Sequence, residues 1–296
     1  MGHNHAHGSN RKVLLFSFII TTAYMFVEAT GGFLTNSLAL LSDAGHMMSD
    51  SISLGVGLLA FTYGAKASDS HKTFGYKRFE ILAAVFNGVA LLVVSIYIFY
   101  EAIHRFADPP EVATSGMLWI ALIGLLVNVL IAFIMRKGDT QGNLNLRAAF
   151  LHVLSDLLGS VGAIVAALLI MFFDWGWADP LASVIVAVLV LLSGWRVTRD
   201  AVHVLMEGTP AEVDLTRVRK RIEQVPEVIS VHDLHVWSIT SGLNAIACHV
   251  VIGSHLTMAD AQKLLNRIEK EMMEEQIEHT TIQLETEANT HTENKM

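Results

Sequence analysis

Two histidine–aspartate pairs lie inside long apolar stretches of the chain. His46 and Asp50 form the first pair and His152 and Asp156 the second, and each pair is four residues apart. At that spacing two side chains share one face of an α-helix. Imidazole nitrogens and carboxylate oxygens suit zinc and related divalent cations, and four such ligands fit a tetrahedral ion. The four residues together are therefore a candidate metal-ligand set.

The apolar surroundings say where these four side chains must point. An ionisable side chain at the centre of a membrane helix costs about 2.5–3.5 kcal/mol on insertion scales, so we expect all four to meet inside a helix bundle rather than to face lipid. A single pair is also compatible with a hydrogen bond between helices, but its repetition in a second stretch favours a metal site. Metal and protons compete for such ligands, so the same residues can couple metal movement to proton exchange.

Composition places the chain in a membrane. Of its 296 residues 52% are hydrophobic and only 16% are charged, with a mean hydropathy of +0.47, whereas soluble domains carry about 25% charged residues. Asp179 and Pro180 form a typical helix start, with Asp as N-cap and Pro at the first helical position. We predict a polytopic α-helical membrane protein with six transmembrane helices of roughly 20 residues or more. They fall at about 13–33, 35–61, 81–103, 115–135, 147–173 and 179–206.

Basic residues in the connections predict the orientation. The connections on the side of the N-terminus hold eleven Lys and Arg residues, and those on the opposite side hold only Arg105. Because connections rich in Lys and Arg stay in the cytoplasm, we expect both termini to be cytoplasmic and the protein to be a multi-pass protein of the cell inner (plasma) membrane. The net charge of -8 is concentrated towards the C-terminal end, and we expect no nucleic-acid partner.

The composition changes after Gly208, where the sequence becomes charged and alternating. Helices are predicted at 214–224 and 258–273, and strands at 228–239, 244–252 and 280–285. This αββαβ order is compatible with a small α+β domain. The expected domains are a His-containing cytoplasmic tail (1–11), a six-helix transmembrane domain (12–207), a cytoplasmic α+β domain (208–287) and a disordered tail (288–296).

Three segments carry a resemblance to a known family. Residues 41–50, 152–156 and 231–237 resemble, in the right order, motifs of the cation diffusion facilitator (CDF) family, and most closely its zinc-transporting branch. The resemblance covers about residues 12–287 and implies a homodimeric zinc/proton antiporter with a metallochaperone-like cytoplasmic domain. It assigns the transport site to His46, Asp50, His152 and Asp156. Some members have Asp at the position of His46, and the His form is associated with preferring zinc over cadmium, so zinc is the expected main substrate and cadmium or cobalt lesser ones.

The resemblance also implies zinc binding near the dimer interface of the cytoplasmic domain, which makes zinc a regulatory ion as well as a substrate. His232 and His249 lie on two neighbouring predicted strands and can face each other across them, although strand register decides which side chains converge. Residues 69–76 resemble a metal-binding loop of some members, but Tyr76 replaces their second histidine, which argues against His71 as a ligand. The site residues implied in the domain are His232, His249, His255 and Glu285.

Other functions fit the sequence less well. An intramembrane metalloenzyme needs an open coordination position and a general base, and the chain has no His-Glu-x-x-His motif; we expect no enzymatic activity. A passive channel would not use a pH gradient to drive zinc movement. The nearest alternative to a zinc exporter is a transporter of this fold with cadmium, cobalt, iron or manganese as its main substrate. The sequence therefore predicts export of zinc from the cytoplasm in exchange for protons, with membrane lipid and a second copy of the chain as partners.

Overall fold

The computed structural model describes residues 4–63, 68–136 and 144–287, with side chains described for 15–52, 54–55, 68–130 and 157–287. The chain divides into two compact units. The first comprises Met1–Ala65 and Ala83–Thr198, and the second comprises Lys66–Leu82 and Arg199–Met296. The segment expected to be a disordered tail, 288–296, lies outside the described residues.

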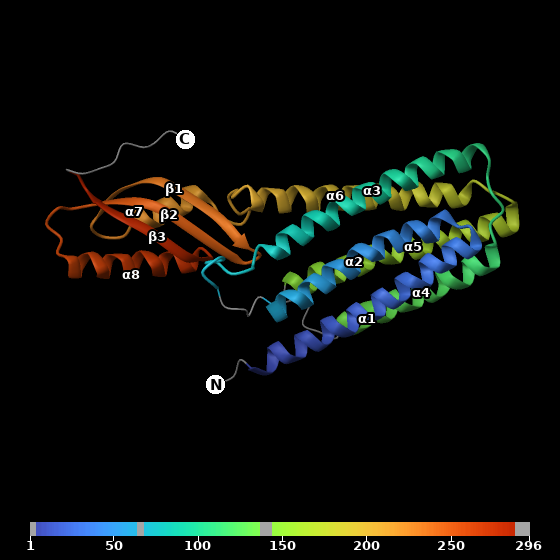
Figure 1. Cartoon of the computed structure of the whole chain (residues 1–296), viewed down its shortest axis with the longest axis horizontal. Coiled ribbons are helices and arrows are strands. Elements are labelled where there is room, and N and C mark those ends of the chain that lie inside the picture. Colours follow the sequence, from blue (N-terminus) through green and yellow to red (C-terminus); the bar gives the residue numbers. More distant parts are fainter. Residues whose placement is uncertain (1–3, 64–67, 137–143, 288–296) are drawn as a thin grey trace. The chain divides into compact units, whose positions relative to one another are not determined.

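The first unit is built from long helices that coincide with the six predicted apolar stretches (Figure 1). On the described residues, α1, α3 and α6 contain segments long and apolar enough to cross a membrane, whereas the described apolar parts of α4 and α5, Thr114–Leu130 and Leu157–Phe173, are shorter. The first helix begins at Asn4, within the segment expected to be a tail. The helices are α1 (Asn4–Thr35), α2 (Leu38–Tyr63), α3 (Phe79–Ala107), α4 (Thr114–Arg136), α5 (Leu144–Phe173) and α6 (Ala178–Leu205).

Small residues let these helices approach closely. The helices α1, α2, α4 and α5 contact one another, and one of their buried clusters is rich in alanine. Between α3 and α6, a Cβ added at Gly88 would lie 2.9 Å from the backbone nitrogen of Thr198. Large apolar side chains face outward instead: Phe86 and Phe172 are each 71% exposed. Small residues between helices and large apolar ones outside are typical of a bundle in lipid.

A buried carboxylate fixes the start of α2. Asp179, which is fully buried, lies in the first turn of α6, but its side chain does not cap that helix as the sequence predicts. It accepts hydrogen bonds from the Ser37 hydroxyl at 2.6 Å and from the backbone N–H groups of Leu38 at 2.7 Å and Ala39 at 3.1 Å. Arg105 Nη1 lies 3.9 Å from the same carboxylate. Asp179 therefore supplies an N-terminal cap to α2 from a neighbouring helix.

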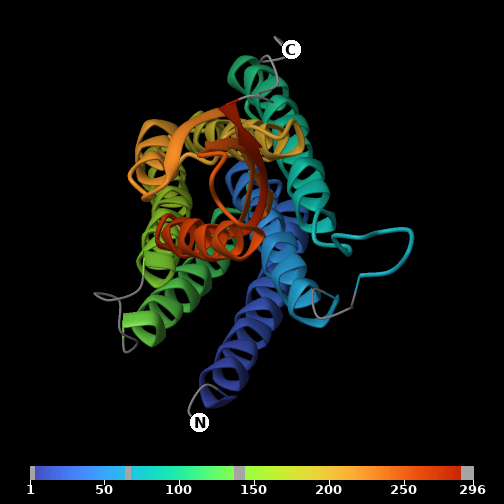
Figure 2. The same cartoon turned by 90° about the vertical axis from the view of Figure 1, so that its left-hand side faces the viewer.

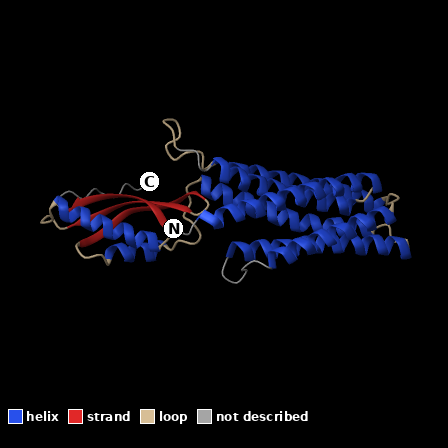
Figure 3. Ribbon diagram, turned by 90° about the horizontal axis from the view of Figure 1, so that it is seen from below, coloured by secondary structure: helices blue, strands red, loops and turns tan. Residues whose placement is uncertain are grey.

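The second unit has the predicted αββαβ order. Strands β1 and β2 form an antiparallel pair, and β3 lies parallel to β2 at the other edge, giving the sheet order β1-β2-β3. These strands are orange to red in Figure 2, and α7 and α8 cover one face of the sheet in Figure 3. The last strand starts at Ile277, three residues before its predicted start. The elements are α7 (Leu215–Glu223), β1 (Val228–Thr240), β2 (Leu243–Ile252), α8 (Met258–Glu274) and β3 (Ile277–Thr286).

Residue alternation separates the two faces of this sheet. Ile246, Cys248 and Val250 of β2 belong to the core under the helices, together with Ile222 and Ile268 from α7 and α8. Successive residues of a strand point to opposite faces, so the alternate positions of β2, including His249, lie on the other face. Every buried member of this core lies between residues 213 and 277, so the C-terminal domain has a complete core of its own.

The connection before α3 packs onto the C-terminal domain within the second unit. The hydroxyls of Thr240 and Ser241, at the tip of the β1–β2 hairpin, donate to the Glu80 carboxylate at 3.0 and 3.2 Å. Phe74 makes an edge contact with the ring of His279, with centroids 5.4 Å apart. These contacts attach the first turn of α3 to the hairpin and the segment before α3 to β3.

Replacing the buried cap tests its contribution to stability. Asp179→Ala removes three accepted hydrogen bonds and leaves two backbone N–H groups of α2 buried, so we expect a loss on the order of 3 kcal/mol. The thermal midpoint of the purified protein in detergent should fall by several degrees. Asp108→Ala, which removes an exposed carboxylate, is the control and should leave the midpoint unchanged. Equal midpoints for both variants would contradict this role of Asp179.

Candidate metal sites

A close contact aligns the two helices that carry the histidine–aspartate pairs. Asp43 of α2 is buried, with 3% of its surface exposed. Its carboxylate lies against the backbone of Gly159 in α5, where an added Cβ would be only 2.5 Å from Asp43 Oδ1. Any side chain at position 159 would push the carboxylate away. The Asp43–Gly159 contact therefore fixes the level at which α2 and α5 meet.

The chain direction then places the two pairs at one level. The helices α2 and α5 run in opposite directions (Figure 1) and contact each other. Three residues after Asp43 is His46, and three residues before Gly159 is Asp156; four residues further in each direction are Asp50 and His152. Because both helices rise by about 1.5 Å per residue, equal steps in opposite directions keep these positions level. Each pair therefore lies beside the other along the bundle.

The structure describes the side chains of the first histidine–aspartate pair and only the backbone of the second. His46 and Asp50 are half-buried in α2. His152 and Asp156 lie in the helical backbone of α5, but their side chains are outside the described part of the chain. The backbone positions of the four predicted transport ligands thus lie at matching levels of two helices that contact each other.

The bundle also holds an ionisable residue that lies outside the two histidine–aspartate motifs. Glu28 of α1 is fully buried and lies beside Tyr24, whose hydroxyl donates to the Ile120 carbonyl of α4 at 2.7 Å. Tyr24 is also within electrostatic range of Asp43. The sequence did contain a signal, since a glutamate inside an apolar stretch is costly unless it faces the bundle interior.

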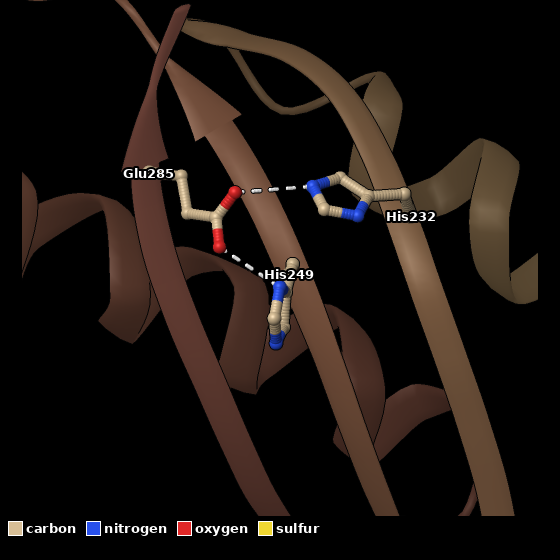
Figure 4. A group of neighbouring side chains, drawn as sticks. All are labelled: His232, His249 and Glu285. Carbon is tan, nitrogen blue, oxygen red and sulfur yellow. Dashed lines mark hydrogen bonds and ion pairs between the residues drawn. The ribbon is translucent and has the colours of Figure 1, made fainter. Parts of the chain in front are cut away.

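The C-terminal domain gathers three of its four predicted ligands. In the sheet His232 is directly opposite His249, and Glu285 is opposite Val251, the next residue of β2 on the same face. Figure 4 shows His232 and His249 both directed at the Glu285 carboxylate. Ligand atoms of the three residues all lie within 4.8 Å of one another, the spacing expected of a group that can hold a metal ion.

The contacts within this group are short and partly shielded from water. Glu285 Oε2 lies 3.2 Å from His232 Nε2, and Glu285 Oε1 lies 2.8 Å from His249 Nδ1. The Glu285 side chain is 3% exposed, and those of His232 and His249 are 16% and 23% exposed. Gln283 donates to Glu285 Oε1 at 2.9 Å. Two imidazoles and one carboxylate supply three ligands that suit zinc.

His255 and the loop before α3 lie apart from this group of three residues. His255 is exposed and pairs with Glu227 at 3.3 Å, so it is not one of the three gathered ligands. In the loop before α3, the Asp69 carboxylate accepts from the Tyr76 hydroxyl at 3.0 Å and from the backbone N–H of His71 at 2.9 Å. This hydrogen bond raises the pKa of Tyr76. The loop thus uses Asp69 to hold its own conformation, and the His71 side chain is exposed.

Cys248 is a core residue, as its place in the strand predicts. It lies next to His249 in the chain but on the helix-covered face of the sheet. Burial raises the pKa of its thiol to about 12. Cys248 therefore belongs to the core under the helices, whereas His232, His249 and Glu285 gather on the other face of the sheet.

Two family profiles together cover most of the chain. Residues 14–206 match the cation efflux transmembrane domain, and residues 210–287 match the cation efflux protein, cytoplasmic domain. The chain therefore has a transmembrane domain followed by a small cytoplasmic domain that contains the three-stranded sheet.

Full-length relatives support the same assignment. The chain is 62% identical over 292 residues to the cadmium, cobalt and zinc/H(+)-K(+) antiporter of Bacillus subtilis strain 168, covering 98% of this chain and 94% of that one. It is 44% identical over 295 residues to the zinc transporter ZitB of Escherichia coli K12, covering 96% and 93% of the two chains. A solved metal-bound C-terminal domain of the CzcD transporter from Cupriavidus metallidurans is 36% identical over 25% of this chain and 99% of that one, with a TM-score of 0.23. The chain belongs to the cation efflux, or cation diffusion facilitator, family and to its zinc-transporting branch.

Proposed function

We propose that the protein is a secondary transporter that exports zinc from the cytoplasm in exchange for protons. The observation that carries the proposal is the level placement of His46 and Asp50 on α2 beside Asp156 and His152 on α5, fixed by the Asp43–Gly159 contact. The relatives named above as zinc transporters and as a cadmium, cobalt and zinc antiporter support this substrate class.

The proposed transport site uses all four residues as zinc ligands. Two imidazoles and two carboxylates match a tetrahedral zinc ion, and the two carboxylates balance its double charge. When zinc leaves, the same groups take up protons, because the metal and protons compete for them. We assign charge balance and proton exchange to Asp50 and Asp156, and the preference for zinc to His46. Cadmium and cobalt are lesser substrates.

The proposal includes an arrangement in the membrane. Six helices span the bilayer within residues 12–207, both termini are cytoplasmic, and the protein lies in the inner (plasma) membrane. The eleven basic residues on one side against Arg105 on the other support this orientation. The cytoplasmic domain occupies residues 208–287, and the working unit is a homodimer. Alternating access exposes the site first to the cytoplasm and then to the opposite side.

The cytoplasmic domain is the proposed sensor of the same ion. His232, His249 and Glu285 bind a regulatory zinc ion, and binding to one arrangement of the dimer better than to another shifts the transporter towards that arrangement. The mutual distances within 4.8 Å support this site. His255 stays a prediction that rests on the family resemblance alone.

Proton exchange can be tested in liposomes that contain the purified transporter and a pH-sensitive dye. Asp50→Asn and Asp156→Asn should each reduce zinc-driven proton flux to the level of empty liposomes, because each removes a charged ligand that also carries a proton. Asp108→Asn, at an exposed position, should retain the wild-type rate. Runs with and without a potassium gradient separate proton from potassium exchange. A wild-type rate with Asp50→Asn would overturn the proposed site.

The role of His46 in selectivity has its own test. His46→Asp replaces an imidazole with a carboxylate, which suits a wider range of cations. We expect the variant to keep zinc transport and to gain cadmium transport, measured as metal-dependent proton flux for each ion. His104→Asp makes the same change at an exposed position of α3 and should not alter the zinc-to-cadmium ratio. An unchanged ratio in His46→Asp would refute the assignment.

The cytoplasmic zinc ion is tested by binding rather than by transport. Replacement of a residue that only supports a metal ligand weakens binding by about 10–100-fold, so Glu285→Gln, which removes a ligand, should weaken zinc binding by at least about tenfold. Competition with a chelating dye measures the affinity. Glu278→Gln, an exposed position on the same strand, is the matched control. Equal affinities for the two variants would exclude Glu285 as a ligand.

A further inference from the structure

Asp233 has an unusual backbone beside the candidate cytoplasmic site. The register of β1 against β2 shifts between His232 and His235, which marks a bulge in β1. Within this bulge Asp233 has a φ of 51°, in the left-handed region that L-residues other than Asp and Asn rarely occupy. An unusual backbone conformation next to a candidate ligand is a pointer to function. The bulge changes the direction in which the Asp233 side chain points.

The redirected carboxylate lies on the far side of the His249 ring from Glu285. Asp233 Oδ2 is 3.8 Å from His249 Nε2, whereas Glu285 Oε1 is 2.8 Å from His249 Nδ1. The other oxygen, Asp233 Oδ1, is 3.0 Å from His235 Nε2. The two nitrogens of His249 thus face two different carboxylates. A shift of about 0.8 Å would bring Asp233 into hydrogen-bonding distance of His249.

This arrangement matches the way proteins orient a metal-binding histidine. A neutral imidazole has one N–H and one unprotonated nitrogen, and a metal takes the unprotonated one. Metal-binding histidines usually donate the remaining N–H to a carboxylate or carbonyl, which fixes the tautomer and makes the ligand more basic. We propose that Asp233 is a positioning residue that accepts the Nε2–H of His249 and so presents Nδ1 to the zinc ion shared with His232 and Glu285.

Asp233 is not itself one of the ligands in this proposal. The group whose ligand atoms lie within 4.8 Å of one another consists of His232, His249 and Glu285, and Asp233 Oδ1 is already in contact with His235. The inference rests on the proposed zinc binding by this group. It adds a residue whose effect on zinc is transmitted through one ligand, His249.

A double-mutant cycle on the full-length protein tests the proposal. Asp233→Asn keeps the shape of the side chain and tolerates the same backbone, but it loses the negative charge. We expect zinc affinity of the cytoplasmic site, measured by competition with a chelating dye, to fall about tenfold. In a His249→Ala background the same substitution should have no further effect, because the residue acts through His249. Glu223→Gln, an exposed carboxylate of α7 under the opposite face, is the charge-matched control.

A glycine variant separates the carboxylate from the backbone. Asp233→Gly adopts a positive φ without strain and lacks the carboxylate, so it should bind zinc as weakly as Asp233→Asn. Wild-type affinity in either variant would overturn the proposal, because both variants lack the negative charge that His249 is proposed to contact. If His249→Ala binds as much zinc as the wild type with the same affinity, the underlying site is wrong rather than the role of Asp233.

Nitrogen NMR of histidine gives a direct readout of the tautomer. The segment 208–287, whose core is self-contained, is labelled on its histidine nitrogens and loaded with zinc. In the wild type we expect metal on Nδ1 of His249 and a proton on Nε2. In Asp233→Asn the chemical shift of this Nε2–H proton should lose the change that a hydrogen bond to a carboxylate causes. Metal on Nε2 in the wild type would overturn the assignment. X-ray absorption gives a second check: if zinc loses an oxygen neighbour in Asp233→Asn, Asp233 is itself a ligand and the assignment is wrong.

Discussion

A carboxyl group within a membrane helix is costly unless it faces the interior of the bundle, and this constraint organises the transmembrane domain. The buried Asp43 carboxylate lies against Gly159 because position 159 has no side chain to displace it. That contact fixes the level at which α2 and α5 meet. Because the two helices run in opposite directions, the histidine–aspartate pairs then lie at the same level along the bundle. A second buried carboxylate, Asp179, caps α2 from α6 and holds the start of the same helix.

The cytoplasmic domain must bury an apolar core while it keeps its polar side chains on another face. Here the alternation of a β-strand separates a core face from a polar face. Cys248 and His249 are neighbours in sequence, yet one lies under the helices and the other beside Glu285. The pairing of His232 with His249 and the offset of Glu285 by one step along the face bring three candidate ligands together. The bulge at Asp233 interrupts this regular pattern at the position that reaches the opposite side of His249.

Short polar contacts hold the start of α3 to the C-terminal domain within the second unit. The hairpin tip, with Thr240 and Ser241, donates to Glu80 in the first turn of α3, and Arg78 pairs with Glu207 at 3.0 Å. These contacts join the start of α3 to segments that lie far along the chain.

The sequence by itself determined the class of the protein and the order of its elements, because helix periodicity and apolar stretches are local properties. The same local patterns pointed to four candidate ligands on α2 and α5. It also placed His232 and His249 on neighbouring strands. Only the tertiary structure decided that Asp179 caps α2, that Glu285 rather than His255 joins the two histidines, and that Asp233 faces His249. These depend on strand register, on a bulge and on which helices meet, and such features arise from packing between segments far apart in the chain.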